Sequence, residues 1–321
     1  MSESRVSLLD RIRRVIRGFP AYVAVRRWQR EGFLRAFRRD RLWRRILATP
    51  PVQTRPRSAT AVEVHTLCYR LDYLTAIWAL KSFYRNSGVD WPLVIHVSGA
   101  AKPLVFRRLR AHFPGATIIA QQEADELVGR RLADGGFVRL AAARRASPFM
   151  LKLTDYPVLC EGATLLGIDS DVLFFARPQE LLDRCAKPGS SYLFQRDPVS
   201  TYNISADIAQ REFGIALAPR VNTGIMVYAR GLPDLEAFER YLTDPGVAVA
   251  NGFIEQTLYA MHASAVGSVA YLPDSYALDL RAGLAYDSLV ARHYAGPSRP
   301  LLTAEGMPWL LRTENAFAVP K

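Results

Sequence analysis

Two acidic residues stand one position apart between two apolar runs in the stretch TLLGIDSDVLFFARP, residues 164–178. If a β-strand continues through them, Asp169 and Asp171 share a face and Ser170 points away, because side chains at i and i+2 leave a strand together. Two carboxylates that close repel each other unless a cation lies between them. Mg²⁺ and Mn²⁺ prefer carboxylate oxygens and keep positions open for substrate phosphate. The pair predicts a divalent metal site; the alternative is a polar turn with both acids solvated.

The composition is that of a folded protein with a large core. Half of the 321 residues are hydrophobic, enough for one large α/β domain or two smaller ones. Cys68, Cys160 and Cys185 are far apart and have no C-x-x-C spacing, so neither a disulfide framework nor a zinc site is indicated. No apolar stretch approaches the roughly 18 residues of a membrane span, and the N-terminus lacks the apolar segment of a signal peptide. We therefore expect a cytoplasmic protein.

The net charge of +12 resides in residues 1–58, which hold 16 arginines against 4 acids. Two stretches, 10–19 and 25–48, place apolar residues among the arginines at helical spacing, and residues 49–58 (TPPVQTRPRS) are typical of a linker. The sequence thus predicts an arginine-rich, amphipathic helical extension and linker over 1–58, followed by a larger domain over 59–321.

This extension has three interpretations. Basic amphipathic helices that carry Trp28 and Phe37 suit the surface of an anionic membrane, which would make the protein peripheral on the cytoplasmic face. A basic patch also suits nucleic acid, but the sequence has no helix-turn-helix, RNA-binding or zinc-finger motif, so nucleic acid is not expected as a partner. In the third interpretation the apolar stripe packs on the larger domain and the arginines are solvated.

From residue 60 onward the pattern alternates between β-strand and α-helix. Strands are predicted at 60–69, 92–99, 116–121 and 164–169, and helices at 73–87 and 102–114. This order indicates a parallel sheet with right-handed crossovers, in which ligands bind beyond the carboxyl ends of the strands. Asp169 stands at such an end. Neither G-x-G-x-x-G after the first strand nor a P-loop motif is present, so a nucleotide would have to bind through a metal on its diphosphate.

Three later stretches complete an ordered set with the acid pair. They are RVNTGIMVYAR with Asn222 and Gly224, FIEQTLYAM with Glu255 and Gln256, and RHYAGPSRP with His293, Gly296 and Arg299. In this order the motifs resemble those of the family-eight glycosyltransferases of the GT-A fold, the group of glycogenin and the bacterial lipopolysaccharide galactosyl- and glucosyltransferases. The resemblance spans roughly residues 60–305. It implies an α/β fold with a mixed, mostly parallel sheet flanked by helices.

The resemblance also implies a chemistry for the metal side. Asp169, Asp171 and His293 would hold Mn²⁺ or Mg²⁺, with histidine favouring Mn²⁺. The metal and Arg299 would stabilise the diphosphate that leaves a nucleotide sugar, by resemblance a UDP-sugar. The acceptor would be a glycan or a lipid-linked sugar, and the family retains anomeric configuration.

On the sugar side, the resemblance places Gln256 beneath the anomeric carbon and lets Glu255 and Asn222 hold sugar hydroxyls. Lys152, on the preceding helix, is expected to reach the donor, although an ordinary amphipathic helix explains it equally well. Gly224 suits a close approach of backbone to ligand. The remaining donor-binding candidates are Gly296, Ser170 and, from a loose match of the first strand, His65.

The chain departs from the family pattern at three positions. Glu255 replaces the usual aspartate, Arg299 the usual lysine, and Leu301 the usual tryptophan. Arginine still binds a diphosphate, through a bidentate fork instead of a point charge. Two alternatives remain: an inverting transferase with Asp197 or Asp274 as general base, and a catalytically silent protein that binds sugar nucleotides or glycans at a membrane.

Overall fold

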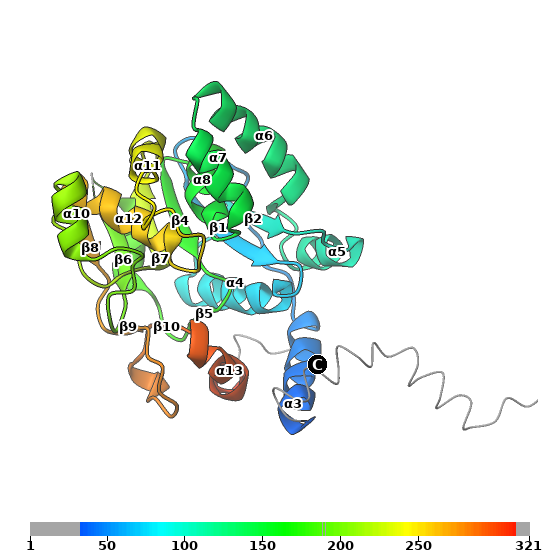
Figure 1. Ribbon diagram of the computed structural model, residues 1–321. Helices are drawn as coiled ribbons and strands as arrows, with labels where there is room; N and C mark the ends of the chain where they lie inside the picture. The colour runs from blue at the N-terminus through cyan, green and yellow to red at the C-terminus, as the bar shows by residue number, and fades with distance from the viewer. Residues whose placement is uncertain (1–32, 188, 190, 313–321) are drawn as a thin grey trace, which may run out of the picture. The chain divides into compact units, whose positions relative to one another are not determined.

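The computed structural model describes residues 33–187, 189 and 191–312 (Figure 1). Contacts divide the chain into two compact units, Met1–Arg45 and Ile46–Lys321. Helix α3 (Phe33–Leu47) begins in the first unit, and within it the guanidinium of Arg39 lies 4.5 Å from the centre of the Trp43 ring. The helix predicted over 25–48 is therefore confirmed from residue 33. The helix predicted over 10–19, together with Trp28, lies outside the described residues.

The larger unit begins before the expected boundary at residue 59, and the expected linker is bound along its surface. The buried ammonium of Lys81 donates to Thr49 Oγ1 and to the carbonyl of Pro50, each at 2.6 Å. Arg57 donates to both carboxylate oxygens of Glu63, at 2.9 and 3.1 Å. Residues 49–58 lack regular structure, yet these bonds make them part of the domain.

A seven-stranded sheet in the order β3-β2-β1-β4-β7-β6-β8 forms the centre of this unit. Its strands are β1 (Val62–Tyr69), β2 (Leu93–Ser98), β3 (Thr117–Ala120), β4 (Thr164–Ile168), β6 (Tyr192–Arg196), β7 (Val221–Ala229) and β8 (Val269–Tyr271). All neighbouring strands pair in parallel except those of β7, which runs antiparallel to β4 and β6. The predicted α/β class with a mostly parallel sheet is confirmed, as are the four predicted strands.

A second, three-stranded sheet in the order β5-β10-β9 extends the first beyond the end of β4. Its strands are β5 (Val172–Phe174), β9 (Tyr276–Ala277) and β10 (Ala291–His293). β10 runs antiparallel to β5, and His293 stands opposite Val172. The chain's C-terminal part is thus attached next to the acid pair.

Helices cover both faces of the main sheet. In Figure 1, α6 (Gln121–Asp134), α7 (Val138–Ala146), α8 (Met150–Leu159), α11 (Leu235–Tyr241) and α12 (Ile254–Ala265) lie on one side and α4 (Tyr73–Ser87) on the other. α4 has the bounds that the sequence predicts, and it ends at Gly88, whose φ of +72° suits glycine. The other elements are α5 (Pro103–His112), α9 (Gln179–Ala186), α10 (Ala206–Phe213), η1 (Tyr286–Ser288), η2 (Gly296–Ser298), α13 (Arg299–Leu301), η3 (Leu302–Gly306) and α14 (Met307–Arg312).

Candidate functional site

The two acids lie in the turn between β4 and β5, not inside one strand as the alternation argument expects. The N–H of Val172 closes this turn on the carbonyl of Asp169 at 3.2 Å. Because β10 pairs with β5, the imidazole of His293 arrives beside the turn. His293 Nε2 lies 3.2 Å from Asp171 Oδ1 and 3.8 Å from Asp169 Oδ2. The three side chains therefore converge, with one ligand atom of each within 4.8 Å of the others.

Each carboxylate turns its second oxygen to a cation of the protein. Asp169 Oδ1 lies 2.8 Å from Lys152 Nζ, and Asp171 Oδ2 lies 3.6 Å from Arg299 Nε. Burial raises the pKa of Asp171, but the charge of His293 and its hydrogen bond outweigh this, so the pKa is lowered overall. Asp171 is thus held as a carboxylate, and the remaining oxygens, Asp169 Oδ2 and Asp171 Oδ1, both face His293 Nε2.

His293 is oriented by Asn222, at the start of β7. Its Nδ1 lies 3.0 Å from Asn222 Oδ1, which also accepts the N–H of Gly224 at 2.9 Å. An amide oxygen only accepts hydrogen bonds, so Nδ1 carries the hydrogen and Nε2 faces the acids. A Cβ on Gly224 would come within 3.0 Å of the His293 ring. The glycine is therefore needed by the imidazole, a reason different from the ligand approach that we expected.

Lys152 lies at the centre of a buried group of polar atoms, in the first turn of α8. Besides Asp169, its ammonium reaches the Thr223 carbonyl at 3.0 Å and Glu255 Oε1 at 3.6 Å. Burial lowers the pKa of Lys152, but the charges of Asp169 and Glu255 raise it above its usual value, so the ammonium stays charged. Glu255 Oε2 accepts from Thr223 Oγ1 at 2.9 Å, while Oε1 is buried without a hydrogen-bond donor among the described residues.

Gln256 is held from several sides at the start of α12. Its Nε2 donates to Asp197 Oδ2 and to Thr201 Oγ1, both at 2.9 Å, and its Oε1 accepts from Asn222 Nδ2 at 3.2 Å. Asn222 Nδ2 also donates to Asp197 Oδ1 at 3.1 Å. This places Asp197, which directly follows β6, next to the amide that the resemblance puts under the anomeric carbon. Burial raises the pKa of Asp197.

Arg299 is half exposed and reaches two acids from the C-terminal segment. Its Nη2 donates to Asp72 Oδ2 at 3.2 Å, in addition to the Asp171 contact. Gly296, three residues earlier, has φ +50°, which suits glycine. Asp72 and Tyr69 were missed in the sequence, although Tyr69 ends β1 and Asp72 follows it, at the edge of the sheet where ligands of parallel sheets bind. The location of these two residues at the carboxyl end of a strand, rather than a sequence motif, was the signal that could have identified them.

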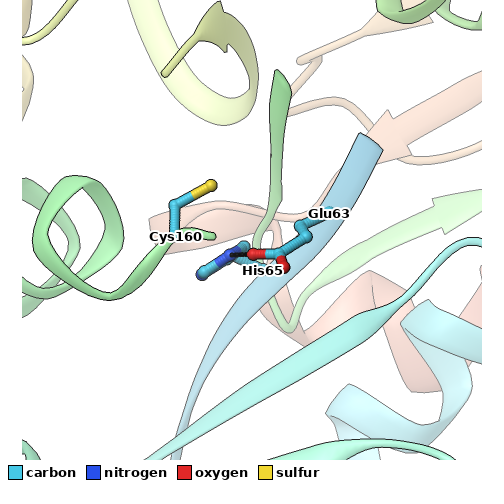
Figure 2. Close-up of side chains that lie close together, drawn as sticks. All are labelled: Glu63, His65 and Cys160. Carbon is cyan, nitrogen blue, oxygen red and sulfur yellow. Dashed lines mark hydrogen bonds and ion pairs between the residues drawn. The ribbon is translucent and has the colours of Figure 1, made fainter. Parts of the chain in front are cut away.

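His65 lies in a separate cluster inside the core, so its position does not support the expected role in donor binding. Figure 2 shows it with Glu63 and Cys160, the carboxylate turned onto the imidazole. The ring is 0% exposed, with Nε2 3.2 Å from Glu63 Oε2 and Nδ1 3.0 Å from His96 Nε2. Both ring nitrogens are thus occupied within the core.

The Glu63, His65 and Cys160 side chains are also close enough together to hold an ion, but their chemistry does not fit one. The guanidinium of Arg57 already occupies both oxygens of Glu63 and would repel a metal cation. Burial, followed by the charge of Glu63, raises the pKa of the Cys160 thiol to about 12, which keeps it protonated. A thiol coordinates metals as the thiolate, so we interpret this cluster as structural.

Two further candidates differ in their surroundings. Ser170 is buried in the turn between the two acids, 7% exposed. Asp274 is exposed in the loop before β9, whereas Asp197 is the candidate base that contacts other site residues. In the part of the chain that the structure describes, no helix is long and apolar enough to cross a membrane.

No protein-family model and no curated protein matches this chain. Among solved structures it is similar to the apo WbbM bifunctional glycosyltransferase, with a TM-score of 0.49 and 13% identity over 81% of this chain and 52% of that one, so it spans about half of WbbM. The galactosyltransferase LgtC in complex with donor and acceptor sugar analogues gives 0.45 and 15%, over 78% and 94%. Core-mannan synthase A from Aspergillus fumigatus, in its Mn/GDP form, gives 0.45 and 12%, over 70% and 76%. All three likenesses are distant, so the chemistry below is argued from the side chains.

Proposed function

We propose that this protein is a metal-dependent glycosyltransferase that uses a nucleotide sugar, by resemblance a UDP-sugar, and retains anomeric configuration. The observation that carries the proposal is the convergence of Asp169, Asp171 and His293 between the cations Lys152 and Arg299. In glycosyl transfer the bond from the anomeric carbon to the diphosphate breaks, and the negative charge that develops on the diphosphate must be stabilised. A metal ion held by the two acids and the imidazole would stabilise this charge, together with the nearby guanidinium of Arg299.

The residues present fit a divalent ion of the Mn²⁺ type. The donors are one oxygen from each carboxylate and His293 Nε2, a nitrogen and oxygen set that suits Mn²⁺ and Mg²⁺, with nitrogen favouring Mn²⁺. The hydrogen bond from Nδ1 to Asn222 orients the ring for this role. When bound, the ion supplies Lewis-acid stabilisation of the diphosphate. Arg299, half exposed beside Asp171, adds a cation that a diphosphate can reach.

The sugar side is supported by the positions of two acceptor oxygens, Glu255 Oε1 and Gln256 Oε1. Glu255 Oε1 is buried without a hydrogen-bond donor among the described residues, and a sugar hydroxyl would satisfy it. Gln256 has both amide hydrogens directed to Asp197 and Thr201, so its Oε1 is the atom that can face an electron-poor anomeric carbon. This oxygen stabilises the positive charge that develops on that carbon as the diphosphate departs.

An inverting reaction is the second candidate because of Asp197. Burial raises the pKa of this carboxyl, as a general base requires, and the residue contacts Gln256. However, its oxygens accept hydrogen bonds from Asn222, Gln256 and Thr201, which occupy three of the about four lone-pair sites of a carboxylate. The bonds favour a role for Asp197 in holding the amides. NMR of the anomeric configuration of the product decides between the two reactions.

We also propose that residues 1–45 bring the enzyme to an anionic membrane surface that carries a lipid-linked acceptor. These residues hold 14 of the chain's arginines. In α3 the exposed Phe37 stands among arginines, which is the composition of an interfacial helix.

The experiment that tests the enzyme is donor hydrolysis. The full-length protein is incubated with UDP- and GDP-sugars and Mn²⁺, and release of nucleoside diphosphate is measured. We expect slow release from one donor, its loss with EDTA and in Asp171→Asn, and its retention in the matched surface variant Asp183→Asn. If the protein binds a nucleotide sugar but never releases diphosphate, even with glycan acceptors, the silent binding protein is the better description.

A further inference from the structure

Tyr69 is the last residue of β1, at the edge of the sheet that carries the candidate site. The phenol oxygen is buried and has no hydrogen bond to any residue that the structure describes. Its position follows from the strand: His65 and Tyr69 share a face, because side chains at i and i+4 of a strand do so. β1 pairs in parallel with β4, and His65 stands opposite Gly167. Tyr69, four residues farther on, therefore ends β1 at the edge of the sheet where the turn with Asp169 and Asp171 follows β4.

The charges around this hydroxyl belong to the candidate site. Burial and the acids Asp72 and Asp169 raise the pKa of Tyr69 to about 12, with Lys152 and Arg299 acting in the opposite direction. The group therefore keeps its proton and can only serve as a neutral donor or acceptor. A buried hydroxyl without a partner is destabilising, and such groups in folded proteins call for an explanation.

We propose that the Tyr69 hydroxyl donates a hydrogen bond to a phosphate oxygen of the bound nucleotide, which makes Tyr69 a further donor-binding residue. This inference rests on the proposed function. Lys152 and Arg299 attract an anion to this place, and the four acids that pair with them exclude one unless it arrives with a metal. A metal-bound diphosphate meets both conditions and offers the acceptor oxygen that the phenol lacks. A ribose or sugar hydroxyl would not explain the two cations.

The test is calorimetric binding of UDP and GDP, each with Mn²⁺, to the full-length protein and to Tyr69→Phe. This change removes only the hydroxyl, and loss of one hydrogen bond to a charged group weakens binding by about ten- to a hundredfold. We expect this loss of affinity for the nucleotide that the wild type binds. The affinity for Mn²⁺ in the absence of nucleotide should be unchanged. Tyr156→Phe is the matched control, because its hydroxyl is also buried without a partner among the described residues but the side chain is 0% exposed.

The outcomes separate this inference from the proposed function. Weaker nucleotide binding in Tyr69→Phe only, with Mn²⁺ affinity and melting temperature preserved, supports it. Wild-type nucleotide binding that Asp171→Asn abolishes and Tyr69→Phe leaves intact overturns it while the proposed function stands. An equal loss of Mn²⁺ and nucleotide affinity in Tyr69→Phe also overturns it, because that is the sign of a structural role. A wild type that binds neither ligand overturns both.

Discussion

Gly224→Ala is the substitution that tests the metal site most directly without removing a ligand. The new Cβ would lie closer than 3.0 Å to the His293 ring, whereas ordinary contacts of a Cβ begin at 3.4 Å. The ring must therefore retreat by more than about 0.4 Å, while metal–ligand distances tolerate only about 0.2 Å. The same Cβ would press on Asn222 Oδ1, which fixes the ring.

We expect Gly224→Ala to weaken Mn²⁺ binding by about ten- to a hundredfold, the range observed when residues that orient metal ligands are changed. Mn²⁺ affinity is measured by calorimetry or electron paramagnetic resonance, and folding by thermal unfolding. Gly129→Ala is the control, because a Cβ on Gly129 meets no atom within 4 Å and the residue lies inside helix α6. That variant should bind Mn²⁺ normally and be slightly stabilised.

A double-mutant cycle makes the reasoning refutable. If Gly224→Ala acts through the imidazole, it should add little in a His293→Ala background, because the atom it displaces is gone. Wild-type Mn²⁺ affinity in Gly224→Ala would refute the assignment of His293 as a ligand. Additive losses would show that the glycine acts on some other feature of the site.

Three further predictions concern other parts of the chain. Arg299→Lys should retain much of the activity, whereas Arg299→Ala should slow transfer by about a hundredfold or more, as for the loss of one electrostatic stabiliser; equal rates in both would remove it from the site. Burial and Arg85 lower the pKa of Lys81 to about 7. Above that pH the unfolded chain binds a proton that the folded chain does not. The free energy of unfolding therefore rises with pH up to the usual lysine pKa. In urea unfolding from pH 7 to 9.5, Lys81→Met should reduce this slope by up to about 1.4 kcal/mol per pH unit, and an unchanged slope would contradict the shift. Protein lacking residues 1–45 should still hydrolyse donor but lose its salt-sensitive binding to anionic vesicles; vesicle binding that survives the deletion would exclude this role.

The alternation of strands and helices was enough to locate the candidate site, because ligands of α/β sheets bind at the carboxyl ends of the strands. Asp169 could be placed at the carboxyl end of a strand from the pattern alone. The contact with His293 could not, because it depends on β10, a three-residue strand that pairs with β5 more than a hundred positions earlier. Strands that short carry no periodic signal. The turn at Asp169–Asp171 was only the alternative interpretation for a related reason, since β5 follows β4 so closely that the two strands read as one.

His65 and Asn222 show why a polar residue in a strand cannot be assigned from the sequence. Both lie in β-branched, apolar stretches, and both are buried. His65 lies inside β1, where Glu63 and His96 occupy both ring nitrogens and leave no atom for a ligand. Asn222 lies where β7 begins, next to the ends of β4 and β6, and every partner it has belongs to the site. The position of a polar residue along its strand, rather than its residue type, decides whether it has a structural role or belongs to the site.

The amide of Asn222 joins the metal side of the site to the sugar side. Its oxygen accepts from the His293 ring, while its nitrogen donates to Gln256 Oε1 and Asp197 Oδ1. An aspartate of the same shape could accept from His293 but would donate nothing, and it would repel Asp197. A leucine would do neither. Only a side chain with both an acceptor and a donor can orient a metal-binding imidazole and a sugar-facing amide from one position. In the proposed function, the geometry of the metal would therefore be coupled to the position of Gln256, and one connected set of hydrogen bonds would hold the diphosphate and the anomeric carbon that it leaves.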